Sequence, residues 1–127
     1  MSIARILRKI IGSRRADIEG IIKRYYSKYK KYISEFVVST IDGFHLSDRD
    51  PDEKSLRFIS LCLKKLGNVL DLSKFNGRII LISTENNIVC GYDYSILVGV
   101  RYNNATDVEN IKKVMNLMLD EIGEVIL

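Results

Sequence analysis

The amino-acid sequence predicts an α/β sandwich of the α+β kind, in which a five-stranded, mostly antiparallel sheet carries helices on both faces. Two observations predict this fold class. Four segments repeat apolar residues every three or four positions, as helices do, and five shorter segments alternate or form β-branched runs, as strands do. Two pairs of strands are separated only by turn residues, so neighbouring strands run antiparallel. The expected order is a basic N-terminal helix followed by α-β-β-α-β-β-β-α.

The bulk composition describes one soluble globular domain. The 127 residues are 46% hydrophobic and 28% charged, enough for a single core. No apolar run approaches the ~18 residues of a membrane span, and MSIARILRKII alternates Ile/Leu with Arg/Lys, unlike a secretory signal. A cytoplasmic location is therefore expected. Cys62 and Cys90 belong to different predicted elements without a CxxC partner, so we expect buried free thiols.

The N-terminal part is strongly basic. Residues 1–32 carry ten Lys/Arg against two Asp/Glu, whereas residues 33–127 carry ten against fourteen. SIARILRKII predicts a short amphipathic helix, and a hinge follows at 12–15. The candidate contacts of this helix and hinge to a partner or an anionic membrane are the cationic residues Arg5, Arg8, Lys9, Arg14 and Arg15. We therefore divide the chain into residues 1–15, a basic helix with its hinge, and residues 16–127, one domain.

A second helix is predicted by apolar and aromatic residues on one face. They are Ile18, Ile21, Ile22, Tyr25, Tyr29 and Tyr32. The run KRYYSKYKKYI also permits a nucleic-acid interpretation, with aromatics on bases and cations on phosphates. Because the tyrosines share the isoleucine face, we expect them in the core with their hydroxyls at the rim. Tyr26 and the lysines are then solvated surface.

Residues 35–47 predict a hairpin. EFVVSTI and FHLS read as strands, and Asp42-Gly43 between them is typical of a type I′ turn. His45, the chain's one histidine, lies beside Asp42 and Asp48, which raises an acid/base alternative. The hairpin instead places His45 on a strand, pointing away from the face of Phe44. The following carboxylates have their own role, because Asp50-Pro51-Asp52-Glu53 is typical of a helix start.

The middle helix is predicted to run to about Leu70. Its apolar residues span an arc of about 160° on a helical wheel, more than one sheet face normally needs. They are Leu56, Phe58, Ile59, Cys62, Leu63, Leu66, Val69 and Leu70. Leu61 falls on the polar side.

The second half predicts three strands and a last helix. RIILIST and NNIVCGY form a hairpin around Asn86-Asn87, and SILVGVRY follows. Gly91 and Gly99 in these strands indicate a bulge or tight packing beneath a helix more readily than a ligand. The capping box Thr106-Asp107-Val108-Glu109 starts the final helix. No P-loop, GxGxxG, HExxH, GxSxG or paired-cysteine motif is present, so we expect neither enzymatic activity nor a cofactor or metal.

The order of elements resembles the roadblock family, named for a dynein light chain, over residues 16–126. FVVSTIDGFHLS is similar to the family's opening hairpin, and YSILVGVRYNNATDVENIKKVM to its last strand and helix. Profilin-like and longin domains share a five-stranded sheet, but a longin domain begins with its hairpin and ends in two helices. The long basic first helix departs from the family pattern.

The resemblance implies a homodimer, or a heterodimer with a second roadblock protein, in which the middle helix and the third strand join two sheets. The interface would use residues 78–83 of the strand, from which Arg78, Ile80 and Ile82 are singled out, with the helix residues Leu56, Ile59, Cys62, Leu63 and Leu66. The wide apolar arc of the helix independently favours self-association. The resemblance further implies a scaffold or regulator that binds a small Ras-like GTPase, without chemistry of its own. The alternative is binding of nucleic acid or an anionic membrane surface through the basic N-terminal helices.

Overall fold

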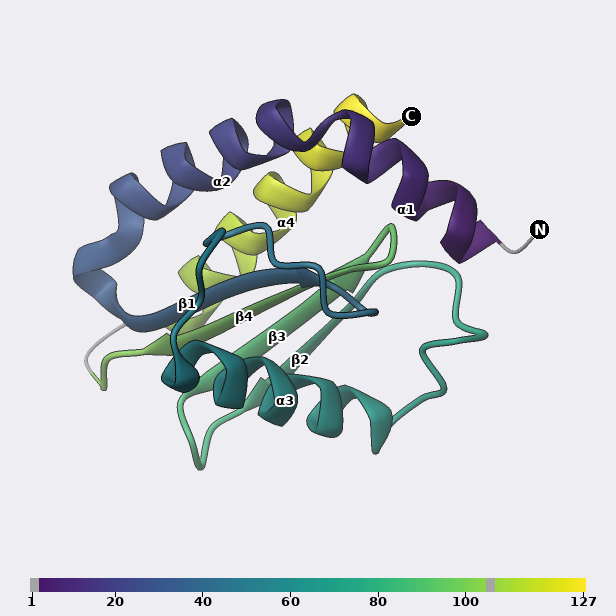
Figure 1. The fold of residues 1–127 in the computed structure, drawn as a ribbon. Helices are drawn as coiled ribbons and strands as arrows, with labels where there is room; N and C mark the ends of the chain where they lie inside the picture. The colour runs from purple at the N-terminus through teal and green to yellow at the C-terminus, as the bar shows by residue number, and fades with distance from the viewer. Residues whose placement is uncertain (1–2, 105–106) are drawn as a thin grey trace.

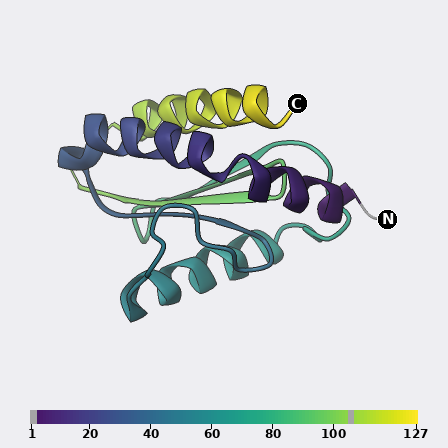
Figure 2. The same cartoon turned by 45° about the horizontal axis from the view of Figure 1, so that its top comes forward.

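The structure, a computed structural model, describes residues 3–104 and 107–127 and has three layers (Figure 1). The middle layer is a four-stranded antiparallel sheet in the order β1-β4-β3-β2. Its strands are β1 (Ile33–Thr40), β2 (Ile79–Ser83), β3 (Ile88–Asp93) and β4 (Ile96–Tyr102). On one side of the sheet lie α1 (Ile3–Ser13), α2 (Arg15–Tyr29) and α4 (Val108–Ile126), and on the other α3 (Glu53–Gly67) (Figure 2). The α+β class with helices on both faces is confirmed.

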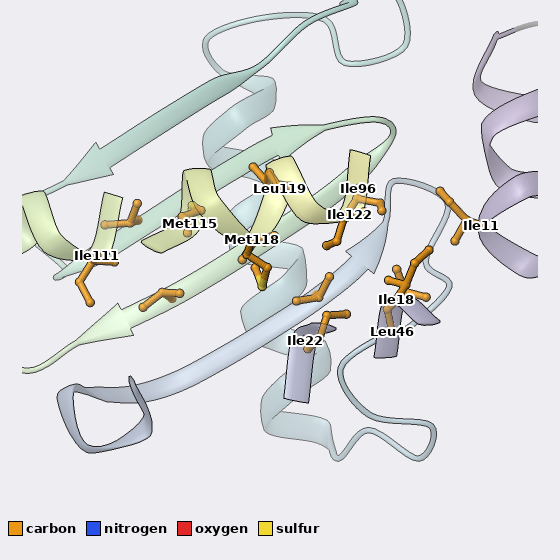
Figure 3. Close-up of a cluster of buried hydrophobic side chains, with 14 of the residues drawn as sticks. Ile11, Ile18, Ile22, Leu46, Ile96, Ile111, Met115, Met118, Leu119 and Ile122 are labelled. Atoms are coloured by element: carbon orange, nitrogen blue, oxygen red, sulfur yellow. The ribbon is translucent and has the colours of Figure 1, made fainter. Parts of the chain in front are cut away.

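Two apolar cores fill the space between the layers. The first joins α1, α2 and α4 to one face of the sheet, and Figure 3 shows its side chains converging from these elements. The second lies between α3 and the opposite face. Two strand glycines allow the helices to approach: a Cβ at Gly91 would lie 2.4 Å from Met115 Sδ, and one at Gly99 would lie 2.6 Å from Cys62 Sγ. Both glycines therefore serve helix packing.

The predicted hinge is a change of direction between α1 and α2 at Arg14, whose φ is −108° and ψ 17°. The apolar stripe continues across this break, because Ile11 and Ile18 are both fully buried in the same core. Leu7 and Ile10 pack against that core from α1. The basic helix is thus docked on its own domain, although the division of the chain at residue 15 stays a prediction.

The second predicted strand is reduced to one β-bridge, between Ser39 and His45. The N–H groups of Leu46 and Ser47 both donate to the carbonyl of Val38, at 2.8 and 3.2 Å. The Ser47 hydroxyl accepts from the Val38 N–H at 2.9 Å, so a side chain replaces the next step of the ladder. We call residues 44–47 the return segment. The sheet of the described residues has four strands, not the five that the sequence predicts.

The turns also differ from expectation. Of Asp42 and Gly43 only the glycine has a positive φ, 91°, so the predicted type I′ turn is wrong. The Gly43 N–H donates to the Thr40 carbonyl at 3.1 Å, which gives a three-residue loop with the glycine as its left-handed residue. A two-residue turn with positive φ at both positions occurs instead at Tyr94 and Ser95, with φ of 54° and 62°.

Both later helices start differently from the predicted capping patterns. Asp52, not Asp50, caps α3: its side chain accepts from the Ser55 N–H at 2.8 Å. At α4 the cap is Asp107, which accepts from the Glu109 N–H at 3.0 Å, and Thr106 lies outside the described residues. Within the part of the chain that the structure describes, no helix has the length and apolar character needed to cross a membrane.

Candidate functional site

The Asp-Gly turn is the docking point for α1. The guanidinium carbons of Arg8 and Arg15 lie 3.6 and 4.2 Å from the centre of the Phe44 ring, within cation–π range. Arg8 Nε is also 3.4 Å from a carboxylate oxygen of Asp42. The turn therefore presents an aromatic ring and a negative charge to two of the five predicted partner-contact cations. These two cations hold the helix against its own domain.

Arg15 continues this contact toward α2 and the return segment. Its Nη2 donates to the His45 carbonyl at 2.9 Å, and its Nε lies 3.6 Å from Glu19. Glu19 in turn accepts two hydrogen bonds from Arg49, at 2.6 and 3.0 Å. The hydrogen bond from Arg49 lowers the pKa of Glu19 below its usual range, against the opposing effect of burial. The group fastens α2 to the chain that leads into α3.

The structure does not assemble the acid/base cluster that the sequence raises around His45. Nδ1 of His45 is buried without a hydrogen-bond partner among the described residues. Burial lowers the pKa of the imidazole, and the charge of Asp48 acts to raise it. Asp42 instead accepts from the Thr40 hydroxyl, and Asp48 accepts the Asp50 N–H. Each carboxylate thus serves the local chain. In residues 3–104 and 107–127 no group of three or more His, Cys, Asp or Glu is placed to hold a metal ion.

The other three predicted contact cations lie on the outside. Arg5, Lys9 and Arg14 are exposed, and Arg14 lies 3.8 Å from Asp17. The apolar side of α1 faces the core instead of solvent. Contact of this helix with a membrane or a partner stays a prediction, and it would use these outward cations.

The aromatic stripe of α2 is only partly core. Tyr25 and Tyr29 are half-buried, but Tyr32 is 42% exposed, which contradicts its predicted place on the core face. The reason is that α2 ends at Tyr29, and a 3₁₀ turn, Lys30–Tyr32, rotates the next side chains off the helical stripe. Tyr26 is on the surface as expected, and its ring stacks on Phe36 with centroids 5.3 Å apart.

The predicted interface residues of α3 divide into two groups. Ile59, Cys62 and Leu66 have at most 5% of their surface exposed, because they form the core against the sheet. Leu56 is 46% exposed and Leu63 half-buried. Of these five predicted residues of α3, Leu56 and Leu63 are therefore the two that present apolar surface to a neighbouring molecule.

The residues of β2 alternate between the two faces of the sheet. Ile80 and Ile82 pack on the α4 side of the sheet, whereas Ile79 and Leu81 pack on the α3 side. Alternation along a strand requires this division, so the period-two pattern was sufficient to identify Ile79 and Leu81 as the α3-face residues. An interface that combined α3 with β2 would therefore use these two residues, which the sequence interpretation did not single out.

Leu61 is a second missed residue. It is half-buried against the α3 core, not on a polar side as predicted. Lys65, one turn later, reaches the hydroxyl of Ser83 at the end of β2, at 3.4 Å. Residues four apart share a helix side, so Leu61 lies on the side of α3 that faces β2. Leu63, two positions from Leu61, lies on the opposite side.

Arg78, at the start of β2, is held by its own chain. It donates to Asp93 at 2.9 Å and to Asp120 at 2.7 Å, and a further hydrogen bond of 3.2 Å reaches the side chain of Asn116. Its side chain is 23% exposed. Arg78 thus joins β2 to β3 and α4.

Comparison of the chain with family models, curated proteins and solved structures gave no match.

Proposed function

We propose that the protein is a non-enzymatic, dimeric scaffold of the roadblock type that binds a small Ras-like GTPase or a complex containing one. The observation that carries the proposal is the position of β2. The resemblance assigns this strand, the third predicted one, to the seam between two sheets, and β2 is an edge strand of the sheet. The observed order, α1-α2-β1-α3-β2-β3-β4-α4, supports the proposal, although the return segment stands where the resemblance expects a second strand.

The chemistry of β2 supports self-association. Its sequence is IILIS, and all five residues are only half-buried. Among the described strands, β2 pairs with β3 alone, so its outer backbone edge has no strand neighbour. An apolar, unpaired edge favours pairing with another strand, and two copies related by a two-fold axis perpendicular to the sheet pair antiparallel with α3 on the same face. Ile79, Leu81 and Leu61 would then meet their counterparts beneath the joined sheet.

The GTPase is proposed from the resemblance. The arginines nearest the sheet support a mechanism without an arginine finger, because Arg78 and Arg101 are engaged by carboxylates of their own chain. Arg101 Nε donates to Glu35 at 3.0 Å. If the protein stimulates GTP hydrolysis, it does so by ordering the GTPase's own catalytic groups.

The first experiment is the solution mass of the intact chain and of a matched pair, Leu61→Asp and Leu63→Asp. Both residues are half-buried leucines on α3, but only Leu61 lies on the β2 side. We expect a wild-type dimer that Leu61→Asp converts to a monomer and that Leu63→Asp preserves. Circular dichroism checks that both variants fold. A wild-type monomer at micromolar concentration would contradict the homodimer, and dissociation by Leu63→Asp alone would place the interface on the other side of α3.

The GTPase is tested with purified small GTPases from the same organism, each loaded with GDP or a non-hydrolysable GTP analogue. We expect binding that depends on the nucleotide and changes little with salt. Absence of binding to every GTPase in both states would contradict this part of the proposal.

A second candidate function is favoured by the outward cations of α1 and α2. Arg5, Lys9 and Lys23 are exposed on α1 and α2, and Lys30 is exposed on the 3₁₀ turn that follows them. All four belong to residues 1–32, which carry ten Lys/Arg against two Asp/Glu. Nucleic acid or an anionic membrane would bind there through charge, because the apolar side of α1 is occupied. Such binding falls steeply with added salt, which distinguishes it from GTPase recognition.

A further inference from the structure

The return segment covers only half of β1. It bonds to Val38 and Thr40: Leu46 and Ser47 donate to the Val38 carbonyl, and the Thr40 N–H donates to the Phe44 carbonyl at 2.9 Å. After Ser47 the chain turns toward α3. The first half of β1, from Ile33 to Phe36, therefore has no strand beside its outer edge in the described chain.

The backbone of Phe36 faces this open edge. Hydrogen bonds of a strand alternate between its two neighbours, so residues 36, 38 and 40 direct their N–H and C=O groups to the same side. Val38 and Thr40 use theirs on the return segment, which places the two groups of Phe36 on the outer side as well. The Phe36 N–H and C=O are thus in line with the hydrogen bonds that Val38 and Thr40 make to the return segment.

A groove of about 230 Å³ lies along this edge. Its floor is the start of β1, one wall is α2, the other is the start of α3, and its end is the loop after the return segment. The lining residues are Ile22, Lys23, Tyr26, Ile33, Ser34, Glu35, Phe36, Ser47, Asp48 and Ser55. Because α2 lies on one face of the sheet and α3 on the other, a strand in the groove would have a wall on each side.

The two walls differ in chemistry. The α2 side is mainly apolar, with Ile22, Tyr26 and the Phe36 ring, and Lys23 is its one charged residue. The α3 side and the end carry the two carboxylates of the lining, Glu35 and Asp48. Glu35 accepts from Arg101, and Asp48 accepts the Asp50 N–H. An added strand alternates its side chains between the two walls. Apolar residues suit the first wall, and lysine or arginine suits the second.

We propose that a short extended segment of a partner protein, alternating apolar and basic residues, adds to β1 along this groove. Its backbone completes the hydrogen bonds of Phe36, which provides affinity, and its side chains read the two walls, which provides specificity. The groove is at the opposite edge of the sheet from β2. This binding is therefore independent of the proposed dimer, and both edges can be occupied together.

The probe is a seven-residue peptide of alternating lysine and valine with blocked termini, titrated into the ¹⁵N-labelled full chain. We expect the largest amide shifts at Phe36 and its neighbours, and slowed hydrogen exchange of the Phe36 N–H. Two control peptides have the same length. The first carries N-methyl groups on the valine amides and cannot donate these backbone hydrogen bonds, and the second has glutamate in place of lysine and so carries the opposite charge. Each should bind at least tenfold more weakly.

The matched protein variants are Asp48→Asn and Asp107→Asn, of which only the first lies at the groove. Asparagine keeps an oxygen for the Asp50 N–H, so the loop is retained. Asp48→Asn should lower the affinity for the lysine-valine peptide several-fold, and Asp107→Asn should leave this affinity unchanged. Leu61→Asp should leave binding unchanged, which separates this proposal from the dimer.

Three results would overturn the proposal. The first is no shift at Phe36 with the peptide at millimolar concentration. The second is equal binding of the N-methylated peptide, which would exclude backbone pairing. The third is shifts confined to residues 79–83, which would place strand addition at β2.

Discussion

The two edges of the sheet are protected by different means. At β1, the same chain supplies the cover: the return segment pairs with Val38, and Arg8 and Arg15 hold α1 over the turn that leads to it. At β2, no strand of the described chain pairs with the outer edge. Natural edge strands are usually blunted, and an apolar one without cover favours pairing. The comparison teaches that local sequence covers one edge in part and leaves the other without a strand neighbour.

Among the tests of this difference between the two edges, the largest loss of stability is expected from Leu46→Ala. Leu46 is the fully buried anchor of the return segment, and removing a buried leucine side chain costs about 2 to 5 kcal/mol of folding free energy. Amide exchange at Thr40 should accelerate with it, because the cover of β1 opens. Denaturant unfolding measures the loss. Leu56→Ala, at an exposed leucine, is the control and should cost much less; an equal loss in both variants would contradict the anchor.

Phe44→Leu should have the next largest effect. The substitution keeps an apolar side chain but removes the ring that both arginines contact, a loss of about 1 to 2 kcal/mol. Docking of α1 should weaken, so trypsin should cleave faster at Arg14 and Arg15. Phe75→Leu, at a half-buried ring that packs on Tyr92 in the other core, is the control and should leave this cleavage rate unchanged. Unchanged cleavage in Phe44→Leu would contradict the docking role.

Ser47→Ala removes two hydrogen bonds from the covered edge, one of 2.9 Å that the hydroxyl accepts and a long one of 3.5 Å that it donates to the Val38 carbonyl. The hydroxyl accepts from the N–H of buried Val38, so we expect a loss of about 1 kcal/mol in the free energy of unfolding. Ser60→Ala, on the exposed side of α3, is the control and should be neutral or slightly stabilising. A neutral Ser47→Ala would show that water replaces the hydroxyl.

The smallest expected effect is a dependence of stability on pH. Burial lowers the pKa of His45 in the folded state, so the unfolded chain takes up a proton at this residue first. The free energy of unfolding is therefore highest above the ordinary histidine pKa of about 6.5 and falls as the pH drops below it. Thermal unfolding between pH 5 and 7.5 measures this. His45→Gln should flatten the curve, and a wild type that gains stability toward pH 5 would contradict the sign.

Much of the fold was predictable because it depends on local patterns. The 3.6-residue period placed the helices, and the tight packing of Gly91 and Gly99 under α4 and α3 followed from glycines in apolar strands. The errors occurred where a long-range contact competed with a local preference. Asp-Gly favours a type I′ turn, but the pairing of Thr40 with Phe44 selected a three-residue loop. The two-residue turn formed at Tyr94 and Ser95, which carry no such local signal.

The candidate surfaces were less accessible to sequence reasoning. The arc of α3 identified its apolar residues, but not which of them the sheet covers; Ile59, Cys62 and Leu66 are buried and Leu56 is not. The half-covered edge of β1 depends on where the return segment leaves the strand, after Ser47. That point is determined by a side chain that bonds to the backbone nine residues away.

The sequence by itself determined the helices of this protein, four of its strands, its charge asymmetry and the glycines under its helices, because these follow from side-chain chemistry within a few residues. Only the tertiary structure decided which edge of the sheet is covered, which basic residues turn inward to Phe44, and which face of β2 joins α3. These outcomes depend on contacts between residues far apart in the chain, and a pattern read along one segment contains no information about which distant segment packs against it.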